Sequence, residues 1–235
     1  TEKPTKVGVA VSDLIAGLYA TVGILGAYTR ARETGQGEHI DISLLEAQLA
    51  TLANQASNYL VSGESPGLSG NAHPNIVPYQ VFETADDPIV VAVGNDGQYV
   101  SLCRAIGCEH LGTDPRFVSN ALRVTNRQAL VALLADELVR QSAEYWLHAF
   151  EGRGIPAGPV NSIGEAFADP QVIDRKTVMQ LVRDDLGEVP LVRSPIMFKN
   201  HVMDKGSAPP ILGDSTEAVL RELGLSEEEV KKLLP

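Results

Sequence analysis

An almost charge-free stretch near the start of the chain constrains its fold more than any other feature. No acidic or basic residue occurs between Leu14 and Thr29, where Gly17, Gly23 and Gly26 interrupt the apolar run. The run is shorter than the roughly 20 apolar residues that a membrane span needs. Small side chains at helical spacing allow another backbone to approach closely. We therefore predict a helix that is buried in a dense core.

The chain reaches this helix within a dozen residues of Thr1, before any strand that would cover it. A helix that is apolar on all sides needs neighbours on all sides. We therefore expect that a further amino-terminal portion, or another chain, provides the cover.

The charges and cysteines exclude several classes of partner. Lysine and arginine number 19 against 30 aspartate and glutamate in 235 residues, a net charge of −11. This charge repels nucleic acid and anionic membranes, so neither is expected as a partner. Cys103 and Cys108 are too few for a disulfide framework and indicate a reducing compartment, the cytoplasm or, in a eukaryote, the mitochondrial matrix. The five histidines lack metal-ligand spacing, so no metal site is predicted.

Strand and helix patterns follow the apolar stretch. Residues 39–42 alternate polar and apolar side chains, as a short strand does. Ser43 and Glu46 have the S-x-x-E spacing of a capping box, which predicts a second helix to about residue 60.

A segment rich in glycine, serine and proline at 62–78 is typical of a linker, and a small α+β unit is predicted after it. The unit contains two paired strands and three helices, at 79–84, 89–94, 99–106, 125–139 and 143–152. Thr125 and Gln128 have capping spacing, and Trp146 is expected in the core.

The last part of the chain reads as a hairpin followed by two short helices. The hairpin strands are predicted at 178–183 and 189–193. Asp214 is the expected cap of the first helix, and Ser226 with Glu229 caps the second.

Asp13 is the one carboxylate in a helix that carries no other charge before Arg30. In one interpretation Ser12 or Asp13 simply caps the helix, whose positive end attracts a carboxylate. In the other, Asp13 is held ionised beside glycines that admit a ligand, and it acts as a nucleophile or a base. The loop at 67–74 is similarly either a plain linker or a set of hydrogen-bond donors for a ligand.

Three stretches of the chain resemble the class III coenzyme A transferases, the CaiB/BaiF family that includes formyl-CoA:oxalate and carnitine CoA-transferases. They are VAVSDLIAGLYATVGILGAYTRARETGQGEHIDISLLEAQ at 9–48, GIPAGPVNSIGEAFADPQV at 154–172 and PPILGDSTEAVLRELGLSEEEV at 209–230. They match the carboxyl-terminal part of a full-length subunit. ANQASNYLVSG with GNAHPNIVPYQVFET is most similar to the branch that handles short dicarboxylates, such as succinyl-CoA:glutarate CoA-transferase.

The resemblance implies a site. Asp13 falls at the family's catalytic aspartate, which forms an anhydride and then a thioester with the substrates. The loop matches a glycine run that covers this aspartate in formyl-transferring members, with only Gly67 and Gly70 retained. Gly70, Asn71 and His73 are therefore the candidate substrate contacts. The implied substrates are an acyl-CoA and a carboxylic acid, with coenzyme A entering as a thioester and no cofactor permanently bound.

The resemblance also implies an α/β fold in which two subunits interlock as a homodimer, each with a Rossmann-like large domain and a small α+β domain. On this view residues 1–62 belong to the large domain, 63–175 form a linker and the small domain, and 176–235 return to the large domain. Most coenzyme A contacts of the family lie outside the matching part, so this chain alone is expected to be inactive. Asp214 stands where the family commonly has histidine, and no role follows for it.

Two other functions stay open. An acyl-CoA racemase has a similar fold and uses an aspartate at the matching helix start as an acid or base. Its members carry a glycine run after that aspartate, whereas Leu14-Ile15-Ala16-Gly17 resembles the transferases. The third function is a noncatalytic interaction module.

Overall fold

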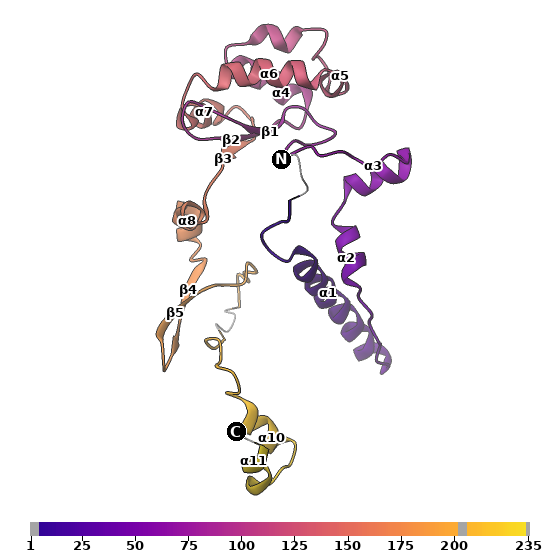
Figure 1. The fold of residues 1–235 in the computed structure, drawn as a ribbon, viewed down its shortest axis with the longest axis vertical. Helices are drawn as coiled ribbons and strands as arrows, with labels where there is room; N and C mark the ends of the chain where they lie inside the picture. The colour runs from indigo at the N-terminus through magenta and orange to yellow at the C-terminus, as the bar shows by residue number, and fades with distance from the viewer. Residues whose placement is uncertain (1–4, 202–205, 234–235) are drawn as a thin grey trace. The chain divides into compact units, whose positions relative to one another are not determined.

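The computed structural model describes residues 5–201 and 206–233 (Figure 1). The chain divides into two compact units, Thr1–Pro159 and Val160–Pro235. Helices and sheet are mixed, as the sequence predicts. The domain boundaries expected near residues 62 and 175 stay a prediction.

The apolar stretch forms α1 (Val11–Thr34), a helix of 24 residues. Gly35 ends it with φ 73°, a left-handed conformation that favours glycine. Small side chains line the half-buried side of α1, and α2 (Leu44–Ala50) lies beside this helix (Figure 1). A methyl group on Gly23 would lie 3.5 Å from the side chain of Ile40, so the connection to α2 packs closely there.

The expected burial of α1 is wrong for the described residues, none of which is buried in this helix. Its large apolar side chains are 50–68% exposed: Leu14, Leu18, Tyr19, Val22, Ile24, Leu25 and Tyr28. The reason is that α2, which lies beside α1, leaves most of their surface uncovered. By length and composition alone α1 would also be able to cross a membrane, a criterion that core helices of soluble proteins meet as well.

The second predicted helix is divided in two. Ser43 accepts a hydrogen bond from the Glu46 N–H (3.4 Å) and caps α2, as its spacing predicts. The helix ends near Thr51, and Ala53, with φ 47°, precedes α3 (Asn54–Ser62). Residues 39–42 form no strand, because no strand of the described chain lies beside them to supply hydrogen bonds.

A three-stranded antiparallel sheet lies at the centre of the first unit's core, in the order β1 (Tyr79–Phe82), β2 (Ile89–Ala92), β3 (Ala157–Pro159). The pairing of β1 with β2 confirms the predicted hairpin. The sequence did not predict β3, because its Gly-Pro composition is typical of a turn.

Helices lie above this sheet and beside it in the view of Figure 1, and the chain forms in order α4 (Asp96–Ala105), η1 (Glu109–Thr113), α5 (Asn120–Thr125), α6 (Arg127–Leu138) and α7 (Ala143–Phe150). The buried residues of this core cluster lie between Val77 and Ile155. Trp146 is buried in it, as predicted. The predicted cap at Thr125 is wrong, because α5 ends there and the N-cap of α6 is Asn126, without a side-chain bond.

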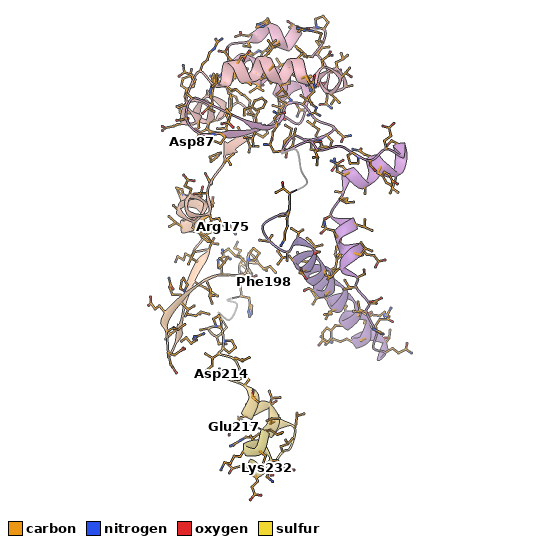
Figure 2. The ribbon with its side chains drawn as sticks, in the orientation of Figure 1. Asp87, Arg175, Phe198, Asp214, Glu217 and Lys232 are labelled. Atoms are coloured by element: carbon orange, nitrogen blue, oxygen red, sulfur yellow. The ribbon has the colours of Figure 1, made fainter. Side chains whose placement is uncertain are left out.

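Among its described residues, the second unit contains α8 (Ile163–Ala168), α9 (Pro170–Asp174), β4 (Val178–Arg183), β5 (Gly187–Val192), α10 (Thr216–Glu222) and α11 (Glu227–Leu233). The antiparallel β4–β5 pair confirms the hairpin. Ser226 and Glu229 exchange hydrogen bonds before α11, as predicted. Asp214 does not cap α10; it precedes the N-cap Ser215, which makes no side-chain bond (Figure 2).

Candidate functional site

Asp13 lies in the first turn of α1 but does not cap it. The N-cap is Ala10, and no side chain bonds to the free amides there, so neither Ser12 nor Asp13 has the capping role that one interpretation gave them. The Asp13 side chain is exposed, and no hydrogen bond or ion pair links it to another residue of the described chain. The carboxylate is therefore available to a ligand.

The surroundings of Asp13 suit a reactive carboxylate. Aligned peptide dipoles place partial positive charge at the start of a helix, which favours an anion in the first turn. Gly17 lies one turn further on the same side, and an added methyl group there would meet nothing within 4 Å. Space for an approaching substrate is thus present beside the carboxylate.

The loop between α3 and β1 carries the other predicted residues. Gly70 has φ 60°, a conformation that disfavours other residues. Asn71 is exposed, and its side-chain oxygen accepts a hydrogen bond from the Val81 N–H (3.0 Å). This bond ties the tip of the loop to strand β1.

His73 is held in one orientation. Its ring stacks on Tyr79, with ring centres 5.2 Å apart and planes inclined by 24°. Its backbone N–H donates to the Tyr79 carbonyl (2.9 Å), and its Nδ1 accepts from the Asn75 N–H (3.1 Å). Because Nδ1 is the acceptor, the neutral ring carries its proton on Nε2. His73 therefore offers an N–H donor from a fixed ring.

Side chains far along the sequence anchor this loop, and sequence reasoning missed them. Arg127 Nη2 donates to the carbonyls of His73 (2.9 Å) and Pro74 (2.7 Å). Asn120 donates to the Asn75 carbonyl (2.8 Å), and the amides of Asn58 and Asn75 exchange two hydrogen bonds. The loop is therefore more than a plain linker. Arg127 and Asn120 are polar residues at helix starts, and nothing in the sequence distinguishes them from polar residues that only contact water.

The predicted residues form two separate groups. Gly70, Asn71 and His73 share one anchored loop, whereas no described hydrogen bond or ring contact joins that loop to Asp13. Within residues 5–201 and 206–233, no group of histidine, cysteine and acidic side chains is placed to hold a metal ion.

Comparison with known proteins places these residues in context. The model of CoA-transferase family III matches residues 1–216. A succinate–glutarate CoA-transferase of Agrobacterium fabrum is 42% identical over 94% of this chain, and the human succinyl-CoA:glutarate CoA-transferase is 36% identical over 94%. The crystal structure of a CaiB/BaiF family protein from Brucella suis superposes with a TM-score of 0.74 at 40% identity, over 94% of this chain and 57% of that one.

The match covers only part of each relative. The chain spans 55% of the Agrobacterium protein and 50% of the human protein, about half of their length. A site that the complete relatives assemble can therefore include residues that lie outside the part matched here.

Proposed function

This chain belongs to CoA-transferase family III, and from that premise we propose that it is part of an enzyme that moves coenzyme A from succinyl-CoA to a short dicarboxylic acid. The relatives named for succinate and glutarate support this choice of substrates, because they match almost the whole chain at 42% and 36% identity. The observation that carries the proposal is Asp13, an exposed carboxylate without a structural role at a glycine-flanked helix start.

Asp13 is the proposed nucleophile. Its carboxylate attacks the thioester carbonyl of the donor, and the carbon–sulfur bond breaks to give a mixed anhydride and the coenzyme A thiolate. The thiolate then attacks the aspartyl carbonyl, which releases the donor acid as its carboxylate. The product is an aspartyl thioester, in which the energy of the donor's thioester bond is retained on the Asp13 carbonyl.

The second half of the reaction reverses these steps with the acceptor. The acceptor carboxylate attacks the aspartyl thioester and forms a new anhydride, with the thiolate as leaving group. The thiolate attacks the acceptor's acyl carbon, and the Asp13 carboxylate is regenerated. No net proton is consumed, but water would hydrolyse either activated intermediate, so the site has to exclude it.

The loop at 70–73 is the proposed source of hydrogen bonds to the substrates. Gly70 leaves backbone accessible, and the Nε2–H of His73 is a donor that could stabilise an oxyanion or hold a carboxylate. Asn71 and His73 occupy the space that smaller glycines would leave open, so we expect a fixed loop rather than a mobile cover.

The apolar side of α1 supports a larger assembly. Soluble monomers rarely expose a contiguous patch of this kind. The proposed cover is the remainder of a Rossmann-like large domain together with a second, interlocked subunit. The isolated chain should therefore bind the dye 1-anilinonaphthalene-8-sulfonate and lack transferase activity, whereas the complete protein should form a dimer by light scattering and bind little dye.

The decisive experiment uses the complete protein that contains this chain, with succinyl-CoA and glutarate as substrates. Asp13→Asn should lower kcat by about 10³-fold or more, because it removes the nucleophile. Asp41→Asn is the matched control, since Asp41 is an exposed carboxylate outside both groups of site residues. Mass spectrometry of the wild type incubated with succinyl-CoA should show coenzyme A attached to the peptide that carries Asp13.

Retention of more than a tenth of the activity in Asp13→Asn would contradict the proposal. A racemase would instead exchange the α-hydrogen of an acyl-CoA with deuterated water in the absence of any acceptor acid, and it would form no covalent adduct.

A further inference from the structure

The loop that carries His73 is fixed by an uninterrupted series of bonds to its backbone. Arg127, the first residue of α6, binds the carbonyls of His73 and Pro74 through one nitrogen. Asn120, the first residue of α5, binds the Asn75 carbonyl and accepts from the Val77 N–H (3.2 Å). Two helix starts of the small α+β unit therefore determine the path of the loop.

Arg127 differs from an arginine that only stabilises a core. Its Nη1 is buried without a hydrogen-bond partner, and no carboxylate of the described chain pairs with it. Arg123, four residues earlier in α5, is fully buried but pairs with Asp96 at 2.7 Å. Arg127 is half-buried, and a cation that loses part of its hydration without a paired anion costs stability, so a neutral side chain would hold a carbonyl at lower cost.

The contacts of Arg127 fall on the peptide units that orient the His73 ring. The carbonyl at His73 lies between two contacts of the same residue: the backbone N–H that bonds to Tyr79 and the ring whose Nδ1 accepts from Asn75. Rotation of the peptide at His73 would break the bond to Arg127. Because Arg127 is part of α6, its bond to the His73 carbonyl fixes the orientation of the His73 ring relative to that helix.

We propose that Arg127 is a positioning residue for coenzyme A transfer, which holds the backbone at His73 and Pro74 so that the Nε2–H of His73 faces the reacting acyl group. This inference rests on the proposed function, because it requires the loop to border the substrates. Arg127 itself touches no substrate. Arg127 instead determines how precisely the loop positions its hydrogen-bond donors, and the rate of transfer is sensitive to that positioning.

The test compares Arg127→Met, Arg127→Lys and the control Arg104→Met in the complete protein. Arg104 is an exposed arginine of α4 that takes part in no ion pair or side-chain hydrogen bond of the described chain. Arg127→Met should lower kcat by about 10²-fold and leave the KM for succinyl-CoA within about twofold. Lysine also donates to carbonyls, so Arg127→Lys should recover most of kcat. The melting temperature of Arg127→Met should lie within a few degrees of that of Arg104→Met, because His73 and Pro74 are only half-buried and water can replace the lost donor at their carbonyls.

Hydrogen–deuterium exchange provides a readout that does not depend on turnover. The amides of residues 71–77 should exchange faster in Arg127→Met than in Arg104→Met, while those of α6 stay protected. Unchanged kcat, or unchanged exchange of the loop, would overturn the inference while Asp13→Asn still tests the proposed function. A loss of kcat that Arg127→Lys does not rescue, with a lowered melting temperature, would also overturn it by indicating a purely structural role. Absence of transfer in the wild type would overturn both.

Discussion

Replacing Arg123 by methionine should destabilise the small α+β unit by about 3 kcal/mol, a value that follows from its contacts. The side chain is fully buried and donates to the carbonyls of Val77 (2.7 Å) and Phe117 (3.0 Å) and to Asp96 (2.7 Å). Its guanidinium also lies 4.4 Å from the centre of the Tyr99 ring. One residue thus joins the loop before β1, the segment before α5 and the start of α4.

The magnitude is the balance of a loss and a gain. Methionine retains much of the length but leaves two buried carbonyls without donors, at about 1–3 kcal/mol each. The loss of the contact over Tyr99 adds up to about 2 kcal/mol. Against this, the variant no longer buries a charge, and Asp96 is 57% exposed and keeps its hydration. The net loss of about 3 kcal/mol is a large part of a domain's stability.

Urea denaturation followed by tryptophan fluorescence measures this change at one position. Trp146 is the only tryptophan of the chain, is buried in the same core and donates to the Leu138 carbonyl (2.7 Å). With a slope of about 2 kcal/mol per molar urea, the midpoint should fall by about 1.5 M. Arg140→Met is the control, because this 65%-exposed arginine pairs only with Glu137 and should cost less than about 0.5 kcal/mol. A loss below about 1 kcal/mol for Arg123→Met would refute the reasoning.

Two further predictions concern titratable groups of the same unit. Burial raises the pKa of the Cys103 thiol to about 11, so iodoacetamide at pH 8 should label the half-buried Cys108 first and Cys103 only after denaturation, as peptide mass spectrometry would show. Because the folded-state pKa of Cys103 is raised, its contribution to stability is present below about pH 9 and is lost as the pH rises toward 11. The side-chain and backbone hydrogen bonds from Arg116 lower the pKa of Asp114 to about 2, so its carboxyl carbon should titrate near pH 2 by NMR. In Arg116→Met the pKa should rise but stay below its ordinary value, because the backbone N–H of residue 116 still donates to the carboxylate. The stability that this lowered pKa provides is present above the ordinary value and is lost as the pH falls toward 2.

Most elements of the core between Val77 and Ile155 were predictable because local patterns determine them. Alternation in β1 and β2 and the apolar period of α6 lead to the observed elements, and Trp146 takes its expected place. Strand β3 was not predictable, since three residues of Ala-Gly-Pro pair only because the chain returns to the edge of β2. Pairings at long separation leave no periodic signal in one sequence.

The candidate site was predictable in part. The residue pattern allowed Asp13 to be either a helix cap or a reactive carboxylate. The structure excludes the helix cap, because α1 begins at Val11 and its N-cap is Ala10. The anchors of the His73 loop escaped prediction because Arg127 is 54 residues from His73 in sequence. The exposure of α1 differs from the expected burial for a related reason. An apolar composition indicates that a helix needs packing partners, but it does not identify the residues that provide them.

The position of the core between Val77 and Ile155 has a consequence for biosynthesis. A core that is contiguous in sequence needs no residues from the flanking segments, so it can form while later residues are still inside the ribosome. Helix α1 emerges earlier, with its large side chains unshielded. A chaperone that binds apolar segments should therefore associate with nascent chains through α1 and be released only when the remaining partners of that helix have folded.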